Sequence, residues 1–191
     1  MRHHRFTTIA LTLGAAVFVW SALPWEELRG PFFLFLLFSG PSIVFSAAIT
    51  AYTIVRSKEY RAAFLLLVGP VTYYGAIMAT KGVGDWVDPI YVAGVVAAWL
   101  FLAATSLLLY RTLVVSAVFG WGSLSAIAIL PLLPPVHGLG VDHLGKLWPF
   151  GLHTLLWYLA VAYAIDMMAN NRLNTDAVQA AQEARPLHGA G

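Results

Sequence analysis

Residues 90–110 read IYVAGVVAAWLFLAATSLLLY, and this stretch decides the fold because it contains no charged side chain. A helix needs about 20 apolar residues to cross the roughly 30 Å of hydrocarbon in a bilayer, and this stretch is long enough. Backbone N–H and C=O groups cannot stay unpaired in hydrocarbon, so the segment is expected to be helical. The stretch therefore predicts a membrane-spanning helix.

Apolar runs of the same kind recur on both sides of this stretch. Hydrophobic residues make up 60% of the 191-residue chain and charged residues 10%, whereas soluble domains carry about 25% charged residues. The fold class that follows is all-α: a polytopic integral membrane protein with a single bundle of six transmembrane helices in residues 1–168 and a polar cytoplasmic tail in 169–191. The predicted spans are Phe6–Leu23, Phe32–Ile54, Ala62–Thr80, Ile90–Tyr110, Thr112–Leu133 and Phe150–Met168.

The distribution of basic residues predicts the orientation of the bundle. Loops that carry more Lys and Arg stay in the cytoplasm, and both termini fall on the richer side, which predicts a multi-pass protein of the cell (inner) membrane with N- and C-terminus cytoplasmic. The lipid bilayer is the expected partner, and the net charge of +2 does not call for nucleic acid. The richer side holds Arg2, Arg5, Arg56, Lys58, Arg61, Arg111, Arg172 and Arg185, and the other side Arg29, Lys81 and Lys146.

A secretory signal peptide is the alternative for the first span. Met1–Arg5 is basic and an apolar run follows it, as in signal sequences. The run Thr7–Ala22 is longer than a usual signal core, and Trp20 is bulky where a cleavage site prefers a small residue. Cleavage within or after Phe6–Leu23 would leave five helices in the same orientation.

Several unusual residues share one depth near the predicted middle of the membrane. Gly40-Pro41 and Gly69-Pro70 interrupt the second and third spans, and proline in a helix favours a kink. Trp99, Trp121 and Trp157 lie at a similar depth in the last three spans. Kinked helices opposite aromatic side chains predict a substrate-binding pocket at the depth where transporters place their sites. Its polar contacts would be Ser39, Ser42, Thr72, Tyr73, Tyr74 and Ser123.

Packing without a ligand is the alternative interpretation of these features. Gly and Pro are common in membrane helices, and indole rings fill space or face lipid. Small residues four apart, at Ala10 and Gly14 and at Ala160 and Ala164, favour close helix contacts. These faces fit packing within the chain and equally a noncatalytic subunit that contacts other membrane subunits.

A second candidate site lies at the predicted outer face. Imidazole and carboxylate groups bind zinc and other divalent metals or act as acid and base, so this group predicts a metal or catalytic site of an integral-membrane, metal-dependent hydrolase-like enzyme. The spacing matches no standard zinc signature, and solvated loop residues are the alternative. The residues of this group are His137, Asp142, His143 and His153.

Other cofactors are not expected from the sequence. Haem b between helices needs two axial ligands, and His153 is the only histidine inside a predicted span. Retinal needs a lysine within a helix, and no predicted span contains one. The absence of Cys excludes disulfides and thiolate metal sites.

The stretch Gly151–Trp157 resembles the last-helix His-x-x-x-His motif of ceramidase- and adiponectin-receptor-like intramembrane hydrolases. His153 matches the first histidine, but Trp157 stands at the second. That family has seven spans, and its Ser and Asp motif has no counterpart here. Six spans with both termini inside also resemble the vitamin-binding subunits of energy-coupling transporters, in architecture only. The leading expectation is a small-solute or lipid-like-molecule binding membrane protein, a transporter or its substrate-binding subunit.

Overall fold

The computed structural model describes residues 4–22, 31–80, 89–133 and 148–183, and these residues form six helical rods with no strand among them. The prediction of an all-α chain is confirmed. Three of the rods change their helical type along their length. The elements are α1 (Arg5–Ser21), α2 (Pro31–Ser57), η1 (Tyr60–Phe64) running into α3 (Leu65–Thr80), α4 (Pro89–Thr105) running into η3 (Ser106–Tyr110), η4 (Ser116–Gly120) running into η5 (Trp121–Leu132), and α6 (Trp148–Glu183).

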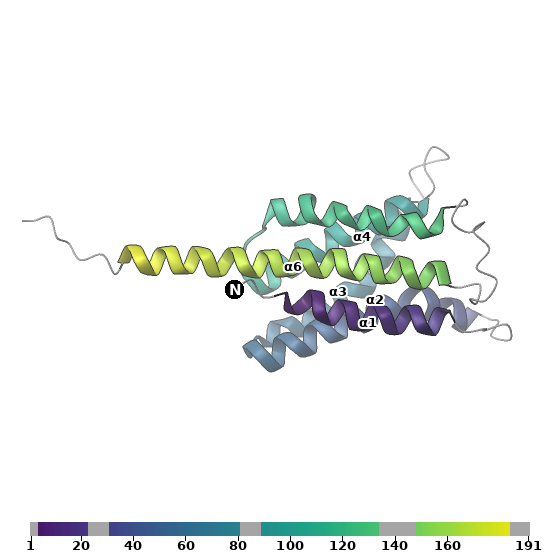
Figure 1. The fold of residues 1–191 in the computed structure, drawn as a ribbon, viewed down its shortest axis with the longest axis horizontal. Helices are drawn as coiled ribbons and strands as arrows, with labels where there is room; N and C mark the ends of the chain where they lie inside the picture. The colour runs from purple at the N-terminus through teal and green to yellow at the C-terminus, as the bar shows by residue number, and fades with distance from the viewer. Residues whose placement is uncertain (1–3, 23–30, 81–88, 134–147, 184–191) are drawn as a thin grey trace, which may run out of the picture.

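The rods lie roughly along one axis, and α6 is the longest of them (Figure 1). It packs chiefly against α1 on one side and η5 on the other, while α3 lies between α2 and α4. The first and last helices of the chain are therefore neighbours. Beyond Met168 the helix continues unbroken through Glu183, so the predicted polar tail begins as an extension of α6.

Two helices among the described residues are long and apolar enough to cross a membrane. These are Val92–Tyr110, with a mean hydropathy of 2.3, and Trp148–Thr175, with a mean hydropathy of 1.3. The other apolar helices of this part of the chain are shorter, namely Arg5–Ser21, Ser42–Ser57 and Ser116–Pro131.

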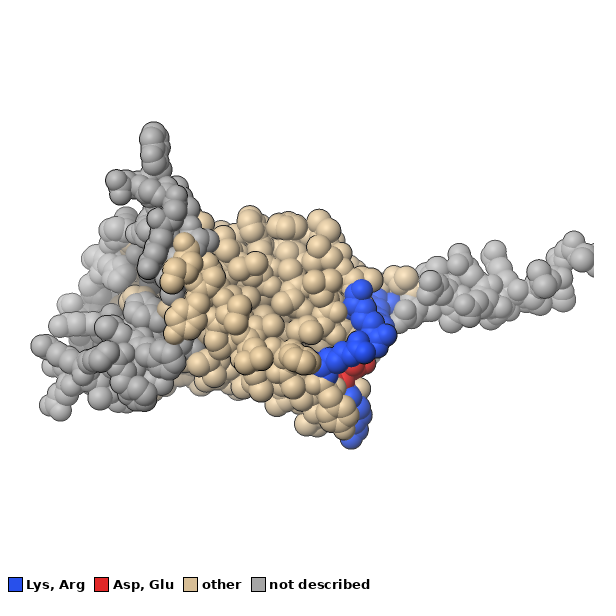
Figure 2. Space-filling model, turned by 180° about the vertical axis from the view of Figure 1, so that it is seen from behind, with Lys and Arg blue, Asp and Glu red and all other residues tan. Residues whose placement is uncertain are grey.

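Charged side chains gather at one end of the molecule, which we call the basic end (Figure 2). The described surface visible in that view beyond this end carries neither acidic nor basic side chains. The opposite end is marked by the last residue of α1, Ser21, and the first residue of α6, Trp148. The charged side chains that the structure describes are Arg5, Arg56, Lys58, Glu59, Arg61, Arg111, Asp166 and Arg172.

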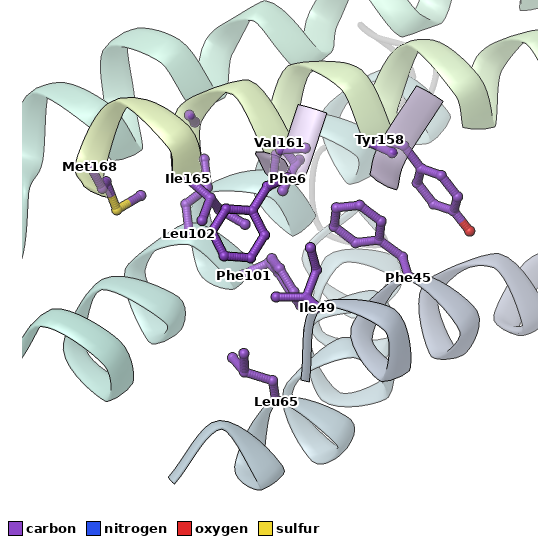
Figure 3. Packing of buried hydrophobic residues seen from close by; sticks show 14 of the residues in the cluster. Phe6, Phe45, Ile49, Leu65, Phe101, Leu102, Tyr158, Val161, Ile165 and Met168 are labelled. Atoms are coloured by element: carbon purple, nitrogen blue, oxygen red, sulfur yellow. The ribbon is translucent and has the colours of Figure 1, made fainter. Parts of the chain in front are cut away.

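The core lies where α6 faces α1, α2 and α4 (Figure 3). Phe45, Phe101 and Tyr158 are each 1% exposed, and Ile49 and Ile165 are fully buried. Small residues on the same helices, such as Ala10 and Ala164, are also fully buried and let the backbones approach. This core joins α6 to α1, α2 and α4.

The fifth rod differs from the continuous helix that Thr112–Leu133 predicted. Thr112–Val114 are not helical, and the rod then passes from the π-helical turn η4 into the 3-10 helix η5. Gly120 and Gly122 lower the helix propensity of this segment. Nearby, the hydroxyl of Ser125 donates a 2.7 Å hydrogen bond to the carbonyl of Gly122, a local pairing that competes with regular α-helical geometry.

The turn between the fourth and fifth rods is held by one buried hydroxyl. Ser106 is fully buried; its Oγ donates to the carbonyl of Thr112 at 2.5 Å and accepts the N–H of Val114 at 3.0 Å. Arg111, in the same turn, has a left-handed backbone with φ of 57°. The Ser106 side chain thus supplies hydrogen-bond partners for two backbone groups of the turn, which lie outside the helices and lack helical partners.

Replacing this hydroxyl is expected to weaken the turn. Ser106→Ala leaves the part-buried N–H of Val114 and C=O of Thr112 without their partner, so we expect a loss of about 1 kcal/mol in the free energy of unfolding. Unfolding by sodium dodecyl sulfate in mixed micelles measures it. Thr112→Ala is the matched control, because the exposed Thr112 hydroxyl makes only a long 3.4 Å contact with the carbonyl of Tyr110. Equal stability of the two variants would show that Ser106 does not hold the turn.

Candidate functional site: a cavity between five helices

A cavity of about 330 Å³ lies between α1, α2, α3, α4 and α6. Its lining on α6 runs from Phe150 to Tyr158, which corresponds to about 12 Å along the helix axis. Trp20 and Ser21, at the last turn of α1, line its outer part. The cavity therefore extends from the end opposite the basic end toward the middle of the bundle, and its volume is at the lower end of the range of small-molecule sites.

Four aromatic side chains close the cavity toward the core. Phe45 stacks on Tyr158, with ring centroids 4.5 Å apart. It meets Trp157 edge to face at 5.9 Å, and its ring is tilted by 48° against that of Phe101 at 5.8 Å. The indole of Trp157 donates a 3.0 Å hydrogen bond to the carbonyl of Gly94 on α4. This bond fixes the ring between two helices and satisfies its only polar group. The floor is thus a rigid aromatic surface.

Most hydroxyl groups of the lining donate to the backbone of their own helices. Ser21 bonds to the carbonyl of Phe18, Ser46 to that of Ser42, Thr72 to that of Gly69 and Thr154 to that of Phe150, at 2.8–3.0 Å. Each O–H proton is therefore engaged locally, while the oxygen keeps lone pairs that accept hydrogen bonds. The walls suit a mainly apolar molecule that carries a few donor groups.

His153 is the one imidazole of the described lining, and its tautomer follows from its partner. Its Nδ1 lies 2.7 Å from the carbonyl oxygen of Ala128 on η5. A carbonyl only accepts hydrogen bonds, so Nδ1 carries the proton and donates. In the neutral ring Nε2 is then an acceptor, and the same Nδ1–H to carbonyl bond is the arrangement that orients metal-ligating histidines.

Glycines let the helices approach closely at the cavity walls. A Cβ atom at Gly151 would overlap the Oγ of Ser21 and lie 2.8 Å from the Cα of Phe18. A Cβ atom at Gly69 would overlap the Oγ of Ser46 and lie 3.0 Å from the carbonyl oxygen of Ser42. Gly69 therefore serves as a point of contact between α2 and α3, beside Pro70 inside α3.

The structure brings some of the predicted pocket residues together. Ser42, Tyr73 and Trp157 all line the cavity, as does Thr72. The neighbouring Tyr74 is 48% exposed and meets Tyr73 edge to face. The side chain of Ser39 lies outside the described part of the structure.

The other two tryptophans lie away from the cavity lining. Trp99 donates a 3.3 Å hydrogen bond to the hydroxyl of Ser123 and packs edge to face on Phe119, so it joins α4 to the fifth rod. Trp121 is 36% exposed and packs edge to face on Tyr163 of α6. Both rings contribute to contacts between helices.

Of the predicted outer-face group, only His153 is described. His137, Asp142 and His143 lie outside the described residues. Within those residues, no three His, Asp or Glu side chains come together as metal ligands would.

Sequence reasoning missed the aromatic floor. Phe45, Phe101 and Tyr158 read as ordinary apolar residues of their spans, and nothing in their spacing distinguishes them from lipid-facing aromatics. Ser46 and Thr154 were also missed; each stands four residues after the carbonyl it bonds, a spacing at which Ser and Thr hydroxyls commonly bond back to the helix backbone.

No protein-family model, curated protein or solved structure matches this chain. The site and its surroundings are therefore the basis for the function proposed next.

Proposed function

We propose that the chain is a six-span membrane protein, with both termini in the cytoplasm, that binds an apolar or amphipathic small molecule in the cavity between its helices. The function is that of a transporter for such a molecule or of its substrate-binding membrane subunit. The observation that carries the proposal is the cavity of about 330 Å³ with an aromatic floor and walls that include Ser and Thr residues.

Exposed apolar side chains support the membrane placement. Large apolar residues are exposed on all six rods: Leu11 is 52% exposed, Val55 77%, Leu67 65%, Leu107 54%, Leu130 53% and, on α6, Leu173 57%. Soluble monomers rarely expose apolar surface so widely. Because the described charges gather at the basic end, the positive-inside rule puts this end in the cytoplasm.

The depth of the cavity supports binding of a solute that enters or crosses the membrane. The cavity begins at the proposed outer end and stops at the Phe45–Tyr158 floor near mid-bundle. Gly69 lies in its wall on α3, next to Pro70 inside the helix, where a missing backbone hydrogen bond lets the helix bend more easily. Rocking of this helix would open or close the cavity.

Filling the cavity is expected to abolish binding while the fold persists. Ala93 lines the cavity on α4, so Ala93→Phe places a ring in the space a ligand needs. The protein is reconstituted in bilayers and labelled with a small aliphatic diazirine, and labelled peptides are identified by mass spectrometry. We expect labelling of the peptide that contains Trp157 to fall at least about tenfold, since a blocked pocket excludes the probe.

Leu100→Phe is the matched control, because the same ring is then added on the exposed face of the same helix, where Leu100 is 44% exposed. It should leave cavity labelling unchanged. Equal labelling in wild type and Ala93→Phe would refute the cavity as a binding site.

Native mass spectrometry with elemental analysis of the purified protein separates this proposal from its rivals. A retained organic molecule without metal supports the cavity. Stoichiometric metal lost in His153→Ala would favour the hydrolase-like enzyme, in which the oriented Nε2 of His153 serves as a ligand. A ligand-free protein that co-purifies with other membrane proteins would favour the noncatalytic subunit.

A further inference from the structure

A second cavity, of about 420 Å³, lies at the basic end, on the side of the molecule away from the first. It is open to one side and is lined by α1, α2, α6, the end of the fourth rod and Glu59. Arg5, Arg56 and Arg172 line it from three different helices. Guanidinium groups from separate elements that converge on one concave space are the usual recognition device for phosphate.

Two buried polar atoms of this lining have no hydrogen-bond partner within the described structure. They are the hydroxyl of Thr53, a residue 5% exposed, and the side-chain amide nitrogen of Asn170. Buried polar groups are nearly always paired, because leaving one unpaired costs about 1–3 kcal/mol. Both groups donate hydrogen bonds, so an acceptor-rich ligand would satisfy both.

Two carboxylates, Asp166 and Glu59, also line this cavity and could pair with its arginines. Asp166 accepts the backbone N–H groups of Phe6 and Thr7, at 3.1 and 2.8 Å, and the Thr7 hydroxyl at 2.7 Å. It is therefore engaged by the N-terminus of α1. The second carboxylate, Glu59, is exposed. The lining holds three guanidinium groups and two carboxylates, so its formal charge is positive. Arg172 also donates a 3.3 Å hydrogen bond to the carbonyl of Leu109 at the rim of the cavity.

We infer that this second cavity is a binding site for a phosphate group, held by Arg5, Arg56 and Arg172 and by the donors of Thr53 and Asn170. Its volume exceeds that of a bare phosphate ion, so it has room for the group to which the phosphate is esterified. In the proposed orientation the site lies at the cytoplasmic surface, where basic pockets between helices bind anionic headgroups. The inference does not depend on a ligand in the first cavity.

The test uses the full chain in a neutral detergent, washed free of co-purified lipid. Dioleoyl phosphatidylglycerol, dioleoylglycerol, which lacks the phosphate, and inorganic phosphate are titrated separately, and inorganic phosphate is also titrated into the protein that holds phosphatidylglycerol. Bound lipid is counted by native mass spectrometry, and the thermal midpoint is followed for all three. We expect phosphatidylglycerol to bind and raise the midpoint, and dioleoylglycerol to do neither.

Matched arginine variants test the location of the site. Arg56→Gln removes one lining cation and should weaken phosphatidylglycerol binding about fivefold, the effect of about one cation near an anionic headgroup. Arg61→Gln removes a cation of the same end that does not line the cavity, and it should change binding less than about twofold.

Thr53→Val supplies a test that does not alter charge. The change is nearly isosteric and removes the unpaired hydroxyl, so the thermal midpoint without ligand should stay equal or rise. Phosphatidylglycerol binding should weaken, because one donor to the phosphate is lost. A merely structural hydroxyl would show the reverse, a lower midpoint with unchanged binding, and that result would overturn its role in the site.

The titrations also identify the source of the phosphate. Binding of phosphatidylglycerol without any effect of inorganic phosphate would support a lipid headgroup, and displacement of the lipid by inorganic phosphate would support a soluble phosphate compound. Equal binding of dioleoylglycerol and phosphatidylglycerol, or equal weakening by Arg56→Gln and Arg61→Gln, would overturn the inference.

Discussion

Asp166→Ala is expected to cause the largest loss of stability of any single change considered, about 3 kcal/mol or more. The carboxylate is 1% exposed and accepts three hydrogen bonds from the first turn of α1. Hydrogen bonds to charged groups contribute about 1.5–3 kcal/mol each, and the variant leaves the buried N–H of Phe6 and the part-buried donors of Thr7 without their partner. His4, the residue before α1, provides no side-chain cap of its own, so nothing local replaces Asp166. Unfolding by sodium dodecyl sulfate in mixed micelles measures the loss.

Two further variants make this prediction specific. Thr7→Val removes one of the three bonds and should cost about 1 kcal/mol alone, but add nothing in the Asp166→Ala background, where its partner is already missing. Asn174→Ala, on the exposed surface of the same helix, should lie within about 0.5 kcal/mol of wild type. Wild-type stability of Asp166→Ala would mean that the carboxylate does not anchor α1.

Gly14→Leu is expected to have the second largest effect, because it forces α1 away from α6. A Cβ atom at Gly14 would lie 2.5 Å from Leu155 Cδ1 and 2.9 Å from Leu155 Cα. The side-chain atom can move by a change of rotamer, but the backbone Cα cannot, so even alanine is overpacked. Overpacking of a core costs about 1–3 kcal/mol, and leucine should reach the upper end of this range. The unfolding transition of the purified protein gives the value.

Ala15→Leu is the control, because Ala15 is the next residue on the same helix and is exposed. It adds the same side chain where neighbouring atoms do not confine it, and stability should stay within about 0.5 kcal/mol of wild type. If both variants unfold alike, the close approach of α1 and α6 at Gly14 is not required.

The number and order of the helices could be predicted from the sequence because each is an apolar run bounded by charged or turn-forming residues. Predicted and observed ends agree closely for Ile90–Tyr110, where the structure has Pro89–Tyr110 for α4 and η3. The fifth rod shows the limit of this reasoning. Its 3-10 and π-helical geometry depends on local glycines and hydroxyls, which an apolar run of suitable length does not reveal.

The facing direction of a side chain was harder to predict than its depth. Counting residues along a helix gives depth, and this count places Trp99, Trp121 and Trp157 at a similar depth in the predicted membrane. The direction in which a side chain points is normally derived from a polar stripe opposite an apolar one. Helices that are apolar on all sides have no such stripe. Of the three rings, only that of Trp157 lines the cavity.

The hydrogen-bond partners of Asp166 also could not be predicted from the sequence. In the sequence, a carboxylate near the end of an apolar span is expected to pair with a basic side chain such as Arg111 or Arg172. The observed partners are backbone N–H groups about 160 residues away in the chain, and backbone donors leave no mark in a sequence. A helix that begins without a capping residue, as α1 does after His4, is the one signal that a distant acceptor was needed.

The contact between the first and last helices has a consequence for synthesis of the chain. Chains are made from the N-terminus, so α1 is synthesised while α6 is still to be translated. Until then the donors of Phe6 and Thr7 lack their acceptor and Gly14 has no Leu155 to pack on. A nascent chain that ends before residue 166 therefore has unpaired hydrogen-bond donors in the first turn of α1, which distinguishes it from a chain that already contains α6.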